Sequence, residues 1–340
     1  MRILIVGGTG FVGAQVLRLL IGDGHAVAVF HRGQTGTKLP PAVQHIYGNR
    51  KSLSTFAFDF KKFAPDVVLD MIPYTEQDAL ILVDTFRPLA NRVVAISSMD
   101  VYAAYGRFRR SDTGEPENAP FDEDAPLRRN LYPYREYARS PDDPVYSYDK
   151  ILVERVVMST EHLSVTILRL PKVYGCGDNQ HRTFEYVKRM DDKRPVILLE
   201  KEKALWRWTR GYAENVAAAI ALAVTNQQAA NRIYNVGESE ALTEADWVRS
   251  VGRAAGWNGE IVAVPKDILP KHLAEGYDYR HNLAADTRRI RKELGYFETV
   301  SREDALEQTV LWERNNPPRN IDAEKFDYAA EDAALLPNLM

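Results

Sequence analysis

The first thirteen residues constrain the fold of this chain more than any other segment. An apolar run at residues 3–6 is followed by three glycines, Gly7, Gly10 and Gly13, and then by an apolar pattern of helical period. This order predicts a strand, a tight turn and the start of a helix. Backbone N–H groups in such a turn can approach a pyrophosphate closely, and the free N–H groups of a helix start add positive charge. We interpret the turn as a dinucleotide site; the plain alternative is a glycine-rich connector.

Apolar runs of strand length recur along the chain and alternate with helical patterns. The runs lie at residues 27–30, 43–47, 67–72, 92–97 and 165–170, and helices are predicted at 53–63, 75–89 and 146–162. Such alternation indicates an α/β protein with a Rossmann-type doubly wound parallel sheet.

Beyond residue 170 the pattern changes. Helices are predicted at 179–190, 214–224, 242–255, 284–294 and 302–315, with a short strand at 234–237. We therefore expect a dinucleotide-binding domain over 1–170, a smaller and partly interleaved C-terminal α/β substrate lobe over 171–316, and a weakly patterned tail over 317–340.

The segment from 103 to 145 interrupts the alternation with six prolines and seven arginines. Connections longer than about 15 residues without structure are usually functional lids or disordered pieces. Either a lid or a partly ordered surface insertion fits this segment.

Composition argues against several classes of function. The net charge is −3, so no basic footprint indicates nucleic acid. No apolar run is long enough to span a membrane. Cys176 is the single cysteine, which excludes an intramolecular disulfide and favours the cytoplasm. The seven histidines lack ligand spacing, so no metal site is predicted.

Tyr146 and Lys150 are four residues apart, which on a helix places them on one face. A tyrosine that exchanges protons near neutral pH needs its pKa lowered by about three units, or roughly 4 kcal/mol. An ammonium about 4 Å away supplies about that much at an effective dielectric of ~20. The pair predicts a catalytic tyrosine, and an amphipathic helix surface is the alternative.

Ser97 ends the strand at 92–97 and Ser98 follows it, at the sheet edge where α/β proteins bind ligands. A serine there could donate a hydrogen bond to a substrate oxygen. The alternative is that one or both hydroxyls cap the strand end or the next turn.

These motifs, with Glu154 and a Val-Tyr-Gly-x-Gly-Asp stretch at 173–178, occur in an order that resembles the extended short-chain dehydrogenase/reductases, the NAD-dependent epimerase/dehydratase family. The resemblance implies an oxidoreductase or epimerase that moves a hydride between a nicotinamide and a hydroxyl or keto carbon of a polar, sugar or nucleotide-sugar substrate. It implies Tyr146 as acid/base, Ser98 as the catalytic serine, and Lys150 as the group that tunes Tyr146 and binds the ribose. It also implies a homodimer through the helices at 75–89 and 146–162.

The residues expected to hold the cofactor are Gly7, Thr9, Gly10, Phe11, Val12, Gly13, His31, Arg32, Asn49 and Lys150. Where NAD-preferring members carry an acidic residue after the second strand, this chain has His31 and then Arg32. An arginine there can pair with a 2′-phosphate, so we expect NADP(H), with NAD(H) as the alternative. Asn49 takes another usually acidic position, and its amide could still donate to the adenine.

Departures from the family pattern bear on the substrate. Met99 stands where the dehydratases carry a general acid, so 4,6-dehydration is not expected. Asp100 is either an additional base or a turn cap, and we expect the cap. Substrate contacts are predicted at Asp100, Arg107, Lys172 and Arg210.

Two other function classes remain open. The chloroplast stem-loop RNA-binding proteins are similar to this family and share a sequence like His31-Arg32-Gly33, although the acidic balance and the Tyr/Lys pair oppose an RNA-binding role. A regulator that senses the cofactor without turnover is the third possibility.

Overall fold

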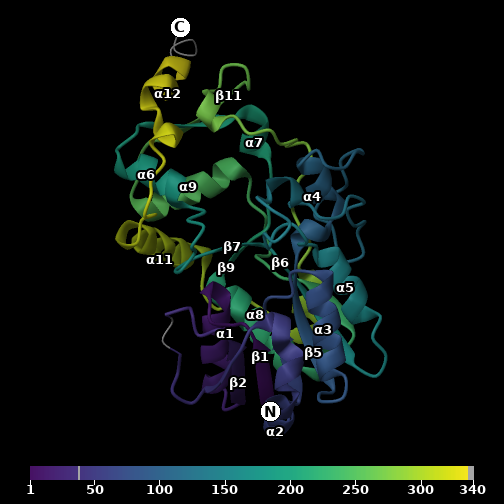
Figure 1. The fold of residues 1–340 in the computed structure, drawn as a ribbon. Coiled ribbons are helices and arrows are strands. Elements are labelled where there is room, and N and C mark those ends of the chain that lie inside the picture. The colour runs from purple at the N-terminus through teal and green to yellow at the C-terminus, as the bar shows by residue number, and fades with distance from the viewer. Residues whose placement is uncertain (37–38, 336–340) are drawn as a thin grey trace.

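A seven-stranded parallel sheet forms the centre of the computed structural model, which describes residues 1–36 and 39–335 (Figure 1). The strand order is β10-β6-β5-β4-β1-β2-β3, and every neighbouring pair is parallel. The strands are β1 (Arg2–Val6), β2 (Ala26–His31), β3 (Gln44–Tyr47), β4 (Val67–Asp70), β5 (Arg92–Ser98), β6 (Ser164–Leu170) and β10 (Arg232–Asn235). The predicted doubly wound fold is confirmed.

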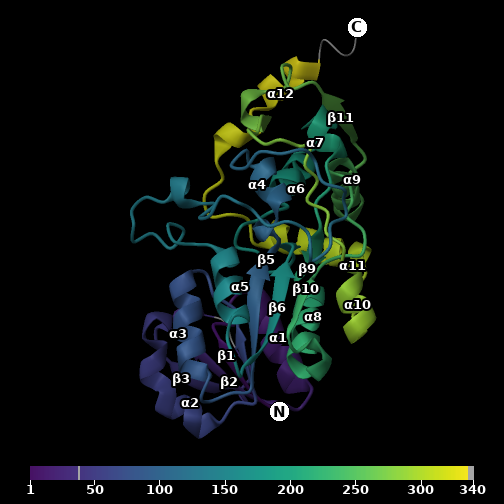
Figure 2. The ribbon, with the colours of Figure 1, turned by 90° about the vertical axis from the view of Figure 1, so that its right-hand side faces the viewer.

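Helices cover both faces of this sheet, as Figure 2 shows from the side. One face carries α1 (Phe11–Gly22), α8 (Ala213–Thr225) and α10 (Arg288–Leu294); the other carries α2 (Ala57–Phe63), α3 (Glu76–Phe86) and α5 (Lys150–Met158). In β1, Ile3 and Ile5 pack into the first layer while Leu4 and Val6 pack into the second. Strands buried on both sides require continuous apolar runs, which is why the sequence revealed them.

The C-terminal lobe lies beyond the carboxyl ends of the strands (Figure 1). Its elements are β7 (Lys172–Tyr174), α6 (Phe184–Asp191), β8 (Val196–Glu200), α7 (Lys201–Leu205), β9 (Arg210–Tyr212), α9 (Glu244–Ala255), β11 (Glu260–Val264), α11 (Arg302–Asn315) and α12 (Tyr328–Leu335). Its core gathers Tyr174, Val187, Trp247 and Leu306. Helix α9 begins directly after Thr243, whose Oγ1 accepts the N–H of Asp246 and caps the helix. None of the described helices combines the length and apolar character that a membrane crossing needs.

Helix α5 is shorter than predicted, because it begins at Lys150 rather than at residue 146. Asp149 has an extended backbone (φ −160°, ψ 112°), and its Oδ1 accepts the N–H of Ile151 at 2.8 Å. Aspartate is a strong N-cap, so the helix starts directly after it. The prediction that Tyr146 and Lys150 share one helical face is therefore wrong.

Two further segments are more ordered than the sequence indicated. In the tail, Glu331 of α12 is buried and pairs with Arg189 of α6 at 2.8 Å, so the tail packs against the lobe as far as Leu335. The segment after β5 opens with α4 (Ala103–Phe108), and Phe108 stacks on Trp206. That part of the segment belongs to an apolar core and is not solvated.

Candidate active site

The glycine turn after β1 has the geometry that a pyrophosphate site needs. Gly7 and Gly8 have φ of +84° and +83°, a region that favours glycine. A Cβ on Gly13 would lie 2.4 Å from the Cα of Gly8, so only glycine lets helix α1 approach the turn this closely. A Cβ on Gly10 would meet nothing within 4 Å, and Gly10 caps α1 without any side-chain hydrogen bond. The first N–H groups of a helix have no partner within the helix, and no side chain of the N-cap residue occupies them here, so the turn fits a dinucleotide.

The three residues predicted for the adenosine end lie at the ends of β2 and β3. His31 Nε2 lies 2.9 Å from His45 Nδ1, and burial, followed by His45, lowers the pKa of His31. Asn49 Oδ1 accepts the N–H of Lys51 and so caps the turn that follows β3. Arg32 is exposed and makes no ion pair with any residue that the structure describes. Its guanidinium is therefore available to an anion.

Sequence reasoning missed a buried ion-pair cluster beside this turn. Asp70, at the end of β4, accepts two hydrogen bonds of 2.6 Å from Arg50, which also pairs with Asp78 at 2.8 Å. An acidic residue that ends an otherwise apolar run, Val67-Val68-Leu69-Asp70, was the available signal. The negative charge of Asp70 also favours the charged form of Lys150, because it raises the pKa of that ammonium.

Lys150 lies at the carboxyl ends of β4 and β5. Its Nζ donates to the carbonyls of Pro73 and Ile96 at 2.8 and 2.9 Å, and lies 4.8 Å from the centre of the Tyr74 ring. Burial lowers the pKa of Lys150 to about 8, against the opposing effect of Asp70. An ammonium has three donors, so one remains for a ligand.

Ser98 rather than Asp100 caps the turn after β5, since Ser98 Oγ accepts the N–H of Asp100 at 3.2 Å. The expectation that Asp100 acts as the cap is wrong. Its Oδ2 instead accepts the hydroxyls of Tyr134 and Tyr148 at 3.0 and 2.9 Å. Burial raises the pKa of Asp100, and Arg128 opposes this shift.

Tyr146 lies in the segment before α5, and its ring packs on the guanidinium of Arg135 at 4.6 Å. Arg135 Nε also donates to the Tyr146 carbonyl at 3.0 Å. The tyrosines that lie beside Lys150 are Tyr74 and Tyr148, whose ring centres are 4.8 and 5.9 Å from Nζ. The structure thus brings Ser98, Lys150 and Tyr148 together, and places Tyr146 on Arg135.

The cations predicted to contact substrate differ in their availability. Arg107 pairs with Glu117 at 2.7 Å, and Arg210 is buried in an ion pair with Glu244. Lys172 makes no ion pair within the described chain, and its Nζ lies 4.4 Å from the ring centre of Trp208. Burial and Arg210 lower the pKa of Lys172 to about 8. Lys172 is the cation of this set that remains free for a ligand.

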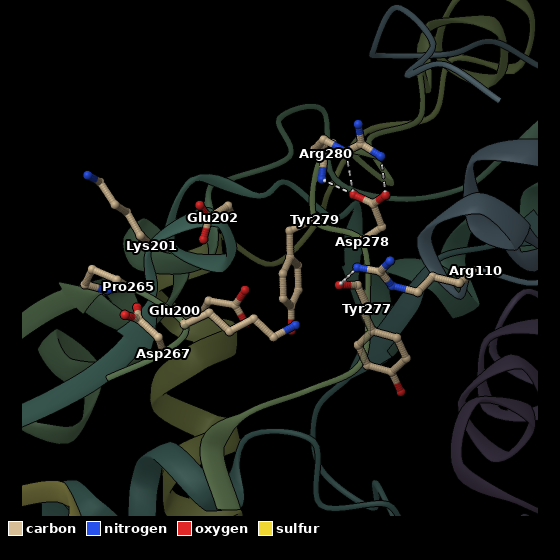
Figure 3. Close-up of a pocket in the computed structure, with 11 residues that line it drawn as sticks. Arg110, Glu200, Lys201, Glu202, Pro265, Asp267, Tyr277, Asp278, Tyr279 and Arg280 are labelled. Atoms are coloured by element: carbon tan, nitrogen blue, oxygen red, sulfur yellow. Dashed lines mark hydrogen bonds and ion pairs between the residues drawn. The ribbon is translucent and has the colours of Figure 1, made fainter. Parts of the chain in front are cut away.

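A separate hollow of about 640 Å³ lies in the C-terminal lobe (Figure 3). Figure 3 shows Arg280 paired with Asp278, and Arg110 directed at the Tyr277 carbonyl. None of the predicted site residues lines this hollow. Its acidic and basic side chains are mixed, so it favours no single class of ligand.

A doubly wound parallel sheet with an open glycine turn after β1 defines a Rossmann-type nucleotide-binding protein. The chain belongs to the NAD-dependent epimerase/dehydratase family, whose model matches residues 3–237.

Relatives within this family carry out different reactions. A 2′-dehydrokanamycin reductase from Streptomyces kanamyceticus is 26% identical over 284 residues, covering 81% of this chain and 72% of the relative. A dTDP-glucose 4,6-dehydratase from Streptomyces niveus is 24% identical over 347 residues, covering 93% and 94%. The structure of the UDP-glucose 4-epimerase from Thermus thermophilus with NAD superposes with a TM-score of 0.66 at 21% identity, covering 93% and 100%. This structural likeness shows the fold.

Proposed function

We propose that this chain transfers a hydride between NADP(H) and a hydroxyl or keto carbon of a sugar-like substrate, as a reductase, dehydrogenase or epimerase. One observation carries the proposal: the glycine turn and Lys150 lie at the same edge of the sheet. The turn follows β1, and Lys150 Nζ bonds to the Ile96 carbonyl of β5 and the Pro73 carbonyl just after β4. A dinucleotide that crosses this edge reaches both.

Each residue has a defined task in this proposal. The N–H groups at Gly10 and the start of α1 bind the pyrophosphate, and the remaining Nζ proton of Lys150 binds a ribose hydroxyl. The Ser98 hydroxyl donates to the substrate oxygen. A tyrosine moves the hydroxyl proton, and the motif spacing predicts Tyr146 for this role. When bound, the nicotinamide supplies or accepts the hydride.

The preference for NADP(H) is supported by Arg32. Its exposed guanidinium, at the end of β2 and without an ion-pair partner in the described chain, can form a bidentate contact with a 2′-phosphate. NAD(H), the cofactor in the solved Thermus structure, is the alternative for this chain.

The proposed substrate is polar and sugar-like, and nucleotide sugars are included. Lys172 and Trp208 support this, since an unpaired ammonium beside an indole ring can bind hydroxyls or an anionic group along the face of a sugar. Met99 argues against 4,6-dehydration, because its buried thioether cannot donate a proton. Incubation with dTDP-glucose tests this point: we expect no 4-keto-6-deoxy product.

We also propose a homodimer through α3 and α5. These helices pack side by side, and each presents an exposed apolar side chain: Leu80 is 42% exposed and Met158 is 40% exposed. Light scattering should give twice the 38.5 kDa chain mass, and Leu80→Lys should give the monomer mass.

A cofactor titration followed by a substrate screen tests the main proposal. Fluorescence titration with NADPH and NADH measures binding without a known substrate. Oxidation of the bound form by a panel of keto sugars and nucleotide sugars then measures turnover. Wild-type protein that binds neither cofactor would contradict the proposal, and salt-dependent RNA retention in its place would favour RNA binding.

A further inference from the structure

Asp100 is the centre of a buried polar cluster at the end of β5. Two phenol hydroxyls, from Tyr134 and Tyr148, donate to its Oδ2 at 3.0 and 2.9 Å. Its Oδ1 is buried and has no hydrogen-bond partner within the described chain. Tyr105 continues the line of hydroxyls, with 3.0 Å between the Tyr105 and Tyr134 oxygens. A buried carboxyl group with one unsatisfied oxygen is costly and calls for a functional explanation.

Tyr148 connects this cluster to the proposed reaction site. It lies two residues before Lys150, its ring centre is 5.9 Å from Nζ, and the Ser98 hydroxyl is near enough to oppose the rise of its pKa. The extended backbone of Asp149 directs the chain so that Tyr148, rather than Tyr146, approaches Ser98 and Lys150. The side chains of Ser98, Tyr148 and Lys150 therefore surround one region.

We propose that Tyr148 exchanges the proton with the substrate hydroxyl and that Asp100 takes up that proton through Tyr148. This inference rests on the hydride transfer proposed above. In the oxidative direction, the substrate O–H bond breaks and its proton forms a new O–H bond on Tyr148. The original proton of Tyr148 passes to Asp100 Oδ2, and the hydride leaves the carbinol carbon for the oxidised nicotinamide. The products are a carbonyl, a carboxylic acid at Asp100 and an unchanged phenol; reduction is the reverse.

Because Asp100 accepts the proton of Tyr148 as the substrate proton arrives, Tyr148 does not have to exist as a free phenolate. Burial and Asp100 raise the pKa of Tyr148, so losing its proton to water would be unfavourable. Burial raises the pKa of Asp100, which makes its carboxylate a stronger base than an exposed one. Tyr148 already donates to Asp100, so the proton has a short path. The charged or titratable groups that face Asp100 are Arg128, Tyr134, Tyr148 and Lys150, with Tyr105 behind Tyr134.

NMR on protein labelled with ¹³C at the tyrosine Cζ tests the pairing without turnover. Tyr148→Phe and Tyr146→Phe identify two of the 17 tyrosine signals. We expect the Tyr148 signal to shift with pH as Asp100 titrates, above the ordinary carboxyl range near pH ~4, and Asp100→Asn to abolish this step. Saturating NADP⁺ should shift the Tyr148 signal more than the Tyr146 signal. A larger shift of the Tyr146 signal than of the Tyr148 signal, or a Tyr148 signal that does not move when NADP⁺ binds, overturns the role of Tyr148.

Turnover provides the second measurement. Tyr148→Phe should lower kcat by about 100-fold or more, in the range of general acid–base catalysis. The loss should exceed that of Tyr146→Phe by at least tenfold, while the exposed Tyr137→Phe changes kcat less than twofold. Asp100→Asn should remove the acidic limb of the pH–kcat profile, which a purely structural role would leave in place. Full activity in Tyr148→Phe overturns the inference alone, whereas wild-type protein that binds no nicotinamide cofactor overturns the proposed function.

Discussion

Glu154 of α5 and Arg169 of β6 form a buried two-point ion pair, with Nε–Oε1 and Nη2–Oε2 distances of 3.0 and 2.7 Å. Glu154 Oε1 also accepts the hydroxyl of Ser97 at 2.5 Å, and Arg169 Nη1 donates to the hydroxyl of Tyr102 at 2.9 Å. One pair therefore joins α5, β5 and β6 directly beneath the proposed site. It positions the strand that carries Ser98 relative to the helix that carries Lys150.

Removing one charge from this pair should destabilise the protein strongly. Glu154→Leu leaves the Arg169 guanidinium buried and unpaired, which costs about 3–5 kcal/mol in the free energy of unfolding. The double variant Glu154→Leu/Arg169→Met should lose less than the two single variants combined. Urea denaturation measures all three. Arg249→Gln, which breaks a half-exposed pair with Asp246, is the control and should cost under about 1 kcal/mol. Additive losses in the double variant would contradict a coupled pair.

Arg32→Ser should weaken NADPH binding and spare NADH. One charge-assisted contact to the 2′-phosphate is worth about 1.5–3 kcal/mol, so the Kd for NADPH should rise about tenfold or more. Quenching of cofactor fluorescence measures both constants. Arg18→Ser removes the same charge from the exposed face of α1 and serves as the control. An equal rise in Kd for NADPH and NADH would show that Arg32 does not contact the 2′-phosphate.

Two glycines of the turn should respond differently to alanine. In Gly13→Ala, the new Cβ meets the Gly8 backbone at 2.4 Å, and overpacking of this kind costs about 1–3 kcal/mol or more. In Gly10→Ala, the Cβ enters open space, so thermal stability should stay near wild type while cofactor affinity falls. Thermal melts combined with NADPH titration separate the two effects. Undiminished affinity in Gly10→Ala would mean that the pyrophosphate lies elsewhere.

Lys150 should make the stability of the protein depend on alkaline pH. Burial lowers its pKa to about 8 in the folded state, against 10.5 in the unfolded chain. The unfolded state therefore binds more protons between these values. The cost of burying the charge is fully present below pH 8 and is relieved as pH rises to 10.5, by roughly 3 kcal/mol in total. Urea denaturation at pH 7 and pH 10 should show a larger gain in wild type than in Lys150→Met, because in that variant only Lys172, whose pKa is also about 8, still contributes. An equal rise in the free energy of unfolding with pH in wild type and in Lys150→Met would contradict this role of Lys150.

Most of the sheet could be predicted from the sequence, because parallel strands buried on both faces must be continuously apolar. The glycine turn could also be predicted, since the positive φ of Gly7 and the close approach of Gly13 to the Gly8 backbone both require glycine. The short strands β7, β8, β9 and β11 escaped prediction, because they pair within a small lobe and carry weaker patterns.

The site was less predictable. Spacing alone placed Tyr146 one helical turn before Lys150, but Asp149 is the N-cap of α5, so the helix begins only at Lys150 and does not include Tyr146. The contact of Tyr134 with Asp100 joins residues 34 positions apart, and Tyr134 lies in a proline-rich segment without periodicity. No local pattern encodes such a contact. Ser98 was predicted from its place at the end of a strand and Lys150 from its spacing to Tyr146, and both lie at the carboxyl ends of the strands.

The place of β10 in the sheet has a consequence for synthesis of the chain. Strand β6 ends at Leu170, yet the strand that pairs with its outer side begins at Arg232, after much of the lobe has been made. Until residues 232–235 leave the ribosome, β6 presents a row of unpaired N–H and C=O groups that can pair with another chain. The nascent protein therefore passes through a stage in which its sheet is open to aggregation, and the later-made part of the chain closes that edge.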